Sequence, residues 1–207
     1  MMSKGEQTRE RILTEATALF NRQGIAATTI NDLLKATGAT KGNLYFHFSG
    51  KEQVGLEVLS RARAAFKTFL ENALQGETPG DQLEQFFCQV LEKNRGKGFV
   101  GGCLFGNTAL ESSDTAPQFA NLVSLVFAEW IDKLQKTIAA AQSVAQVRQD
   151  LPADQLAELV VIIIEGGIMQ ARLNKAEGAL TRALGTLRVL LELQSEPQTE
   201  SINGGTV

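Results

Sequence analysis

The stretch from Thr28 to Phe48 constrains the fold most, because it predicts two short helices joined by a tight turn. Thr29 can cap the first helix, with Asp32 three residues further on in the spacing of a capping box. Gly38 stands where a turn needs a residue that tolerates positive φ. Thr40 can cap the second helix. Two short helices around a glycine-containing turn indicate a helix-turn-helix unit.

The composition predicts a folded protein with a sizeable core, since 43% of the 207 residues are apolar. Two cysteines are too few for a disulfide framework. The N-terminus has no apolar run after its charges, so we expect no signal peptide. The longest apolar run, 159–164, is much shorter than the ~20 residues of a membrane span. We therefore expect a cytoplasmic protein that does not enter the membrane.

The charge is divided unevenly along the chain. Residues 1–51 contain seven Lys/Arg and four Asp/Glu, a net of +3, whereas residues 52–207 contain thirteen and nineteen, a net of −6. The positive charge is thus confined to the segment with the helix-turn-helix unit. A basic head on an acidic body is typical of a DNA-binding protein whose second part does not touch DNA.

Apolar stripes at helical spacing predict an all-α chain of about nine helices. Beyond the helix-turn-helix pair, the helices are expected at 5–23, from 51 to before 76, and at 82–94, 114–142, 151–174 and 177–193. A capping box over 49–52 is expected to open the long fourth helix, and 78–81 is interpreted as a turn. We expect a DNA-binding domain at 1–51, a helical ligand-binding and dimerisation domain at 52–194, and a disordered tail at 195–207.

From Thr8 to Lys51 the chain resembles the TetR family of bacterial transcriptional regulators. The matching residues are Thr8, Arg9, Ile12, Leu13, Leu19, Phe20, Gly24, Ala27 to Ile30, Asp32, Leu33, Gly38, Lys41, Gly42, Leu44, Tyr45, His47, Phe48, Lys51 and Glu52. Many unlike residue types agree at fixed spacing over about a quarter of the chain. In the body, 102–111 and 166–173 look like segments of some of these regulators. The resemblance implies a three-helix head, a helical effector-binding body, and a homodimer formed by the last two long helices.

A helical wheel of the second short helix separates its two sides. Leu44 faces the core, so at 100° per residue the opposite side carries the residues that would face a major groove. These are Lys41, Gly42, Asn43 and Phe46. Asn43 could bond an adenine edge, Lys41 a guanine, and Phe46 a thymine methyl. Many relatives carry Thr or Ser where this chain has Asn43, so its operator preference should not be copied from them.

Contacts to the DNA backbone are expected from a second set of residues around this helix. They are Thr29, Tyr45, His47 and Lys51. Thr40 belongs to the expected DNA-binding set as well, without an assigned contact. Lys51 lies in the first turn of a helix, where the macrodipole disfavours a cation, and a bound phosphate would explain its presence. Packing beside Phe48 is the alternative for His47, and a solvated helix face is the alternative for the whole surface.

The body is expected to bind a small-molecule effector in an apolar pocket between its helices. The candidate residues combine aromatic side chains with polar ones in otherwise apolar helices: Phe66, Cys103, Asn107, Phe127, Trp130, Glu165, Met169 and Arg172. Gln170 belongs to the same polar group. For each aromatic residue, simple core packing is the alternative. Buried polar residues need partners or a ligand.

Cys103 supports a second hypothesis, because some regulators with a similar Gly-Cys-Leu stretch sense electrophiles or oxidants. A helix N-terminus or a nearby cation such as Arg172 would favour its thiolate. A small cysteine that packs in the interior is the alternative.

The sequence gives little support for an enzyme or for a metal-binding protein. The segment 96–101 fits G-x-G-x-x-G, but it follows a helix rather than a strand. One histidine and two scattered cysteines do not form a zinc site, and a nucleophile system would have to use His47. We expect no enzyme, cofactor or metal. The two hypotheses are a ligand-responsive repressor that binds a palindromic operator as a homodimer, and a binding protein whose head no longer binds DNA.

Overall fold

The computed structural model describes residues 3–194, and these residues form an entirely helical protein. The described part of the chain contains nine helices: α1 (Lys4–Gln23), α2 (Ile30–Thr37), α3 (Lys41–His47), α4 (Lys51–Ala73), α5 (Pro79–Arg95), α6 (Leu104–Ser112), α7 (Pro117–Ser143), α8 (Ala153–Asn174) and α9 (Gly178–Leu191). The predicted all-α fold is confirmed. The disordered tail predicted at 195–207 lies outside the described residues.

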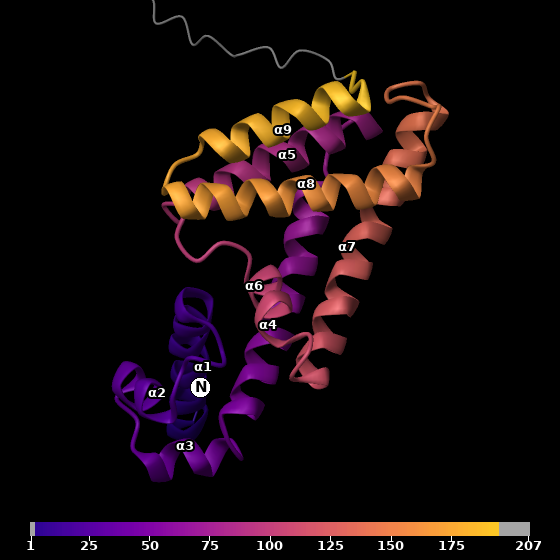
Figure 1. The fold of residues 1–207 in the computed structure, drawn as a ribbon. Helices are drawn as coiled ribbons and strands as arrows, with labels where there is room; N and C mark the ends of the chain where they lie inside the picture. Colours follow the sequence, from indigo (N-terminus) through magenta and orange to yellow (C-terminus); the bar gives the residue numbers. More distant parts are fainter. Residues whose placement is uncertain (1–2, 195–207) are drawn as a thin grey trace, which may run out of the picture.

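The head consists of α1, α2 and α3 around one apolar core (Figure 1). Phe20, Leu33 and Leu44 are almost completely buried in it. Val54 and Val58 of α4 belong to the same core, so α4 begins as part of the head. In Figure 1, α4 then leaves the head and runs beside α7 towards the other end of the molecule. The domain division at residue 51 stays a prediction, because one helix serves both parts.

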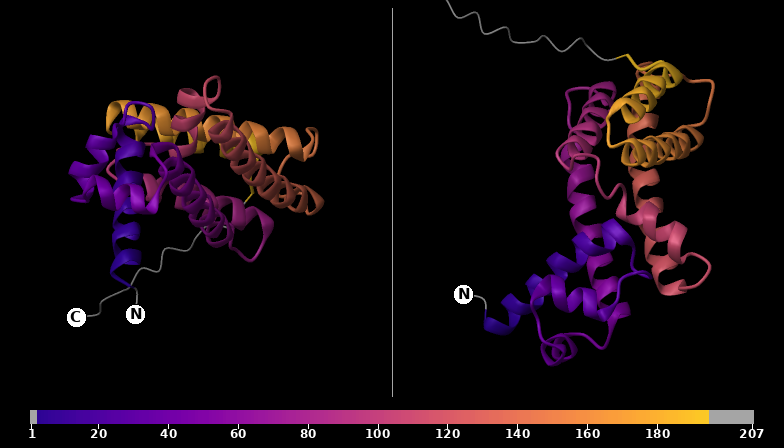
Figure 2. Two further views of the ribbon diagram at one scale, coloured as in Figure 1. Left: turned by 90° about the horizontal axis from the view of Figure 1, so that it is seen from below. Right: turned by 60° about the vertical axis from the view of Figure 1, so that its left-hand side comes forward.

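The body has its own core between α4, α5, α7, α8 and α9. Figure 2 shows α8 and α9 side by side at the end far from the head. Leu156, Val160 and Ile164 lie on one side of α8 and are buried in this core. Ile162 lies on another side and is 66% exposed. The small helix α6 lies between the head and α8, where it can touch both.

Two local predictions were wrong. The segment 49–52 forms no capping box: Gly50 caps α4 without a side-chain hydrogen bond, while the Gln53 Oε1 atom accepts from the Ser49 backbone N–H at 2.6 Å. The segment 78–81 is not a separate turn but the capped start of α5. Thr78 caps α5 together with Asp81, and a proline in the first helical position is already fixed near helical φ.

Candidate DNA-binding surface and ligand cavities

The α2–α3 unit is built by local hydrogen bonds. The Asp32 backbone N–H donates to Thr29 Oγ1 at 3.1 Å, and the Thr29 backbone N–H donates to Asp32 Oδ2 at 2.9 Å. Gly38 adopts a φ of +62°, and nothing lies within 4 Å of where its Cβ would be. The turn therefore selects glycine for its backbone conformation rather than for space. Thr40 caps α3 by accepting from the Asn43 backbone N–H at 3.2 Å.

The outer side of α3 is open to solvent, as the helical wheel predicted. Leu44 is fully buried while Phe46 is 82% exposed. The exposed residues on this side are Lys41, Gly42, Asn43 and Phe46. Tyr45 flanks them at 46% exposure, with the Lys41 Nζ atom 6.0 Å from its ring centre. An exposed helix face with an amide, an ammonium and an aromatic ring can contact base edges.

His47 and Lys51 have structural partners within the head. His47 is half-buried, with its ring centre 4.9 Å from that of Phe46 and 6.2 Å from that of Phe48. The Lys51 Nζ atom donates to the Ala26 carbonyl oxygen at 2.9 Å, which ties the start of α4 to the α1–α2 loop. This bond gives Lys51 a structural reason for its place in a first helical turn. The phosphate contacts of both residues stay predictions.

Of the cavities in the described part of the body, two share Cys103 and Glu165 in their linings. The outer cavity, of about 790 Å³, opens between α6 and α8. The inner cavity, of about 320 Å³, lies among α4, α5, α7 and α8. From the predicted effector set, the outer cavity is lined by Cys103, Asn107, Phe127, Glu165, Met169 and Arg172. The inner cavity is lined by Phe66, Cys103, Trp130 and Glu165. Gln170 is exposed and lines neither of them.

Cys103 lies at the N-cap of α6, where its Sγ atom accepts from the Gly106 backbone N–H at 3.4 Å. Burial, together with the neighbouring Glu165, raises the pKa of this thiol far above its ordinary value. Burial also raises the pKa of the Glu165 carboxyl group. Arg172 does not activate the Cys103 thiol as expected, because its guanidinium donates to Asn107 and to the Arg22 carbonyl oxygen instead. The surroundings of Cys103 thus disfavour a thiolate.

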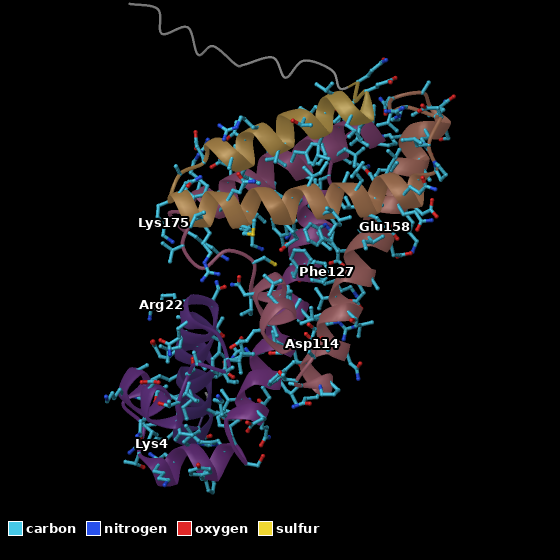
Figure 3. The ribbon with its side chains drawn as sticks, viewed as in Figure 1. Lys4, Arg22, Asp114, Phe127, Glu158 and Lys175 are labelled. Atoms are coloured by element: carbon cyan, nitrogen blue, oxygen red, sulfur yellow. The ribbon has the colours of Figure 1, made fainter. Side chains whose placement is uncertain are left out.

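Arg172 and Asn107 connect the wall of the outer cavity to the head. The Arg172 Nη1 atom donates to Asn107 Oδ1 at 2.7 Å, and the Arg172 Nη2 atom donates to the Arg22 carbonyl oxygen at 3.2 Å. Asn107 Nδ2 in turn donates to Asn21 Oδ1 at 3.2 Å. Figure 3 shows Arg22 at the end of α1 that lies nearer the body. The end of α1 is therefore bonded to α6 and to α8.

Glu111, at the other end of α6, binds the α1–α2 loop. Its carboxylate accepts from the Ile25 backbone N–H at 2.9 Å and from the Ala26 backbone N–H. Gly24 makes this approach possible, because a Cβ there would lie 2.6 Å from Glu111 Oε1. A shift of α6 would consequently move the segment that leads into α2.

Several residues of these sites were not predicted. Lys93 and Lys97 line the inner cavity, and Asn21 lines it from the head. Glu111 lies in the segment 102–111, for which the sequence predicted no contact with the head. A pattern within one helix cannot show which side chains of another helix it will meet, so the sequence held no signal for these contacts.

Within residues 3–194, no helix is long and apolar enough to cross a membrane. The same residues include no group of three or more His, Cys, Asp or Glu side chains placed to bind a metal ion.

A helix-turn-helix head joined to a helical body with internal cavities defines a DNA-binding regulator with a ligand-binding part. Two family models match the chain. The model described as "Bacterial regulatory proteins, tetR family" covers residues 12–58, and "Tetracyclin repressor-like, C-terminal domain" covers residues 79–187. The chain belongs to the tetR family of bacterial transcriptional regulators. As a member of this family it is a regulator rather than an enzyme.

Individual relatives agree with this assignment along almost the whole chain. The HTH-type transcriptional repressor DhaR of Mycobacterium sp. (strain GP1) is 25% identical over 94% of this chain and 96% of its own. The repressor ComR of Escherichia coli (strain K12) is 28% identical over 89% of this chain and 90% of its own. The crystal structure of a TetR regulator from Chloroflexus aurantiacus is 34% identical, covers 93% of this chain and 98% of its own, and superposes with a TM-score of 0.84.

Proposed function

We propose that this regulator is a repressor that binds a palindromic operator as a homodimer and is released by a small molecule bound in the body. The observation that carries the proposal is the set of hydrogen bonds from Arg172 through Asn107 to the end of α1. It joins a cavity wall to the head, so an occupant of the cavity can change the position of α3. Two distantly related family members carry the name repressor, which supports repression here. A regulator of this kind acts in the cytoplasm.

The outer side of α3 would lie in the major groove. Asn43 would read a base edge, since it is exposed and only its backbone N–H takes part in the Thr40 cap. Lys41 and Phe46 would contact neighbouring bases, and Gly42 would let the backbone approach closely. Contacts to the phosphates would come from Thr29, Thr40, Tyr45, His47 and Lys51.

The second copy would bind along α8 and α9. One side of α8 exposes apolar residues at helical spacing: Ile162 is 66% exposed, Met169 59% and Leu173 80%. Gly166 lies between them, with nothing within 4 Å of where its Cβ would be. On α9, Val189 is 79% exposed and Gly185 is equally open. Such a face is typical of a helix that packs against a second copy. Two recognition helices one DNA turn apart, about 34–36 Å, would require a palindromic operator.

The release mechanism follows from the bonds of α6. A ligand that contacts α6, from the outer cavity at Asn107 or from the inner cavity at Phe105, would weaken the Asn107–Arg172 bond or displace α6. Because Glu111 binds the α1–α2 loop, this displacement would reach the helix-turn-helix unit. Coupling of this kind typically changes affinity about 5–150-fold.

A DNA selection experiment tests the proposal. Duplexes enriched from a random pool by the full-length protein should contain an inverted repeat. Asn43→Ala should then lose about 1–3 kcal/mol of discrimination at particular base pairs, while affinity for random DNA changes little. Asn174→Ala, an exposed asparagine at the end of α8, serves as the matched control. Failure to enrich any sequence would favour the alternative, a ligand-binding protein whose head no longer binds DNA.

A further inference from the structure

The inner cavity differs from the outer one in its chemistry. The outer cavity is bordered by exposed apolar side chains of the proposed dimer face, including Met169 and Leu173. Both cavities have two basic side chains and share the Glu165 carboxyl group, but the inner cavity is also lined by four aromatic rings, including the indole of Trp130. Its volume of about 320 Å³ is near the lower end of the ~300–1,000 Å³ typical of ligand sites. It therefore suits a ligand with a single ring.

Aromatic side chains form a continuous wall centred on Phe66. Its ring centre lies 5.2 Å from that of Trp130 in an edge-to-face arrangement, and 6.0 Å from that of Phe69 in a stacked one. The ring centre of Phe105 lies 5.8 Å from that of Phe66. Faces and edges of several rings within one small cavity favour an aromatic guest, because ring pairs are stabilised beyond the burial of their area.

Lys93 supplies a positive charge at this wall. Its Nζ atom lies 3.8 Å from the ring centre of Phe69 and 5.7 Å from that of Phe66. Lys93 keeps part of its surface exposed, but desolvation beside the rings lowers the pKa of its amine to about 8, with a smaller contribution from the charge of Lys97. No ion pair within residues 3–194 includes either lysine. Two neighbouring cations without a carboxylate partner favour an anionic ligand.

Two buried polar atoms of the same cavity are without a hydrogen-bond partner in the described part of the chain. They are the indole nitrogen Nε1 of Trp130, a donor, and the Oε1 atom of Glu165. Trp130 is only 4% exposed. Buried polar atoms without partners are costly, and a ligand that bonds them removes that cost. A hydroxyl group can both accept from an indole N–H and donate to a carboxyl oxygen.

We propose that the inner cavity binds a small aromatic carboxylate that carries a hydroxyl group. The carboxylate lies at Lys93, with Lys97 nearby, and the ring lies against Phe66. The hydroxyl group lies at the inner end, near Trp130 and Glu165. This inference rests on the proposed function: the ligand would be the effector that releases the operator, and it would act on α1 through Asn21, which lines the same cavity and bonds Asn107.

Trp130 makes binding directly measurable, since it is the only tryptophan in the chain and lines the cavity. The full-length protein is titrated with 4-hydroxybenzoate, its 2- and 3-hydroxy isomers, benzoate and 4-hydroxybenzamide while tryptophan fluorescence is recorded. We expect a saturable change with at least one hydroxybenzoate. The uncharged amide should bind at least tenfold more weakly than its acid, and benzoate several-fold more weakly than the best isomer. No saturable change up to millimolar hydroxybenzoate, or equal binding of acid and amide, would overturn the proposal.

Substitutions of single lysines test which positive charge makes the cavity prefer hydroxybenzoate over the uncharged amide. Lys93→Met should weaken the binding of hydroxybenzoate at least tenfold and abolish the preference over the amide. Lys93→Arg, which keeps the charge, should retain that preference even if packing changes. Lys175→Met is the matched control, because Lys175 is an exposed lysine of the outer cavity. The affinity of this variant for hydroxybenzoate should stay within twofold of the wild-type value. Circular dichroism verifies that each variant folds. Loss of binding in Lys175→Met but not in Lys93→Met would place the ligand in the outer cavity and contradict the proposal.

Operator release is measured separately by fluorescence anisotropy of a selected duplex. Hydroxybenzoate binding without release would support the ligand class and contradict its role as the effector. Absence of binding would overturn the ligand class alone, since the selection of palindromic DNA does not depend on it.

Discussion

The head and the body carry function in different ways. In the head, the candidate contacts lie on one short helix, and local caps such as the Thr40–Asn43 bond fix their direction. In the body, each candidate site depends on helices far apart in sequence, as in the bond from Arg172 to Asn107. Substitutions in the head should therefore alter DNA binding directly. Substitutions in the body should act through assembly, through α6 or through ligand affinity.

The largest expected effect comes from the body, through loss of the second copy. Ile162→Asp would place a charge in the proposed dimer face, where burial without a partner is unfavourable. The protein should become monomeric in size-exclusion chromatography with light scattering. Operator affinity should fall about 100-fold or more, because two linked half-site contacts become one. Val144→Asp, at a 56% exposed position after α7, should change neither property. A dimeric Ile162→Asp protein would show that the subunits meet elsewhere.

The next effect tests the bond between body and head. Glu111→Ala removes the acceptor of the Ile25 and Ala26 backbone N–H groups. Hydrogen bonds to a charged group contribute about 1.5–3 kcal/mol each, so the exchange of these two amides should accelerate at least about tenfold. Hydrogen-exchange mass spectrometry of residues 20–30 measures the exchange rate of these amides. Glu71→Ala, at an exposed position of α4, is the control. Unchanged exchange would show that α6 does not hold the loop.

A smaller effect is expected for Lys51→Ala in the head. Loss of one phosphate contact should weaken binding to operator and random DNA alike, by about three- to tenfold, and lower the salt slope by about one. The bond to Ala26 gives this substitution a stability cost as well, which thermal unfolding measures. Lys35→Ala, at an exposed position of α2, is the control. A lower melting temperature with an unchanged salt slope would assign Lys51 a structural role alone.

The same contrast explains what the sequence could predict. The capping box of Thr29, the φ of Gly38 and the burial of Leu44 depend on residues a few positions apart, so patterns alone indicated them. The eight predicted effector residues line the two cavities, and their role in binding an effector stays a prediction. Lys93 could not be predicted: only the packing of α5 against α4 brings it over the ring of Phe69. The capping box expected at Ser49 failed because the Ser49 backbone N–H bonds the Gln53 side chain and Gly50 takes the cap position.

The smallest effect concerns pH and the inner cavity. Burial, with a smaller contribution from the charge of Lys97 and an opposing one from Cys103, lowers the pKa of Lys93 to about 8. Burial raises the pKa of Glu165, which lines the same cavity. A bound carboxylate favours the ammonium form, so affinity should be constant while Lys93 is charged and should fall above pH 8. The expected decrease is about fivefold between pH 8 and pH 9. Benzoate, which has no other titrating group, is the ligand for this series, and Lys93→Gln should remove the dependence. A wild-type profile that stays flat to pH 9 would mean that the charge of Lys93 does not contribute to binding.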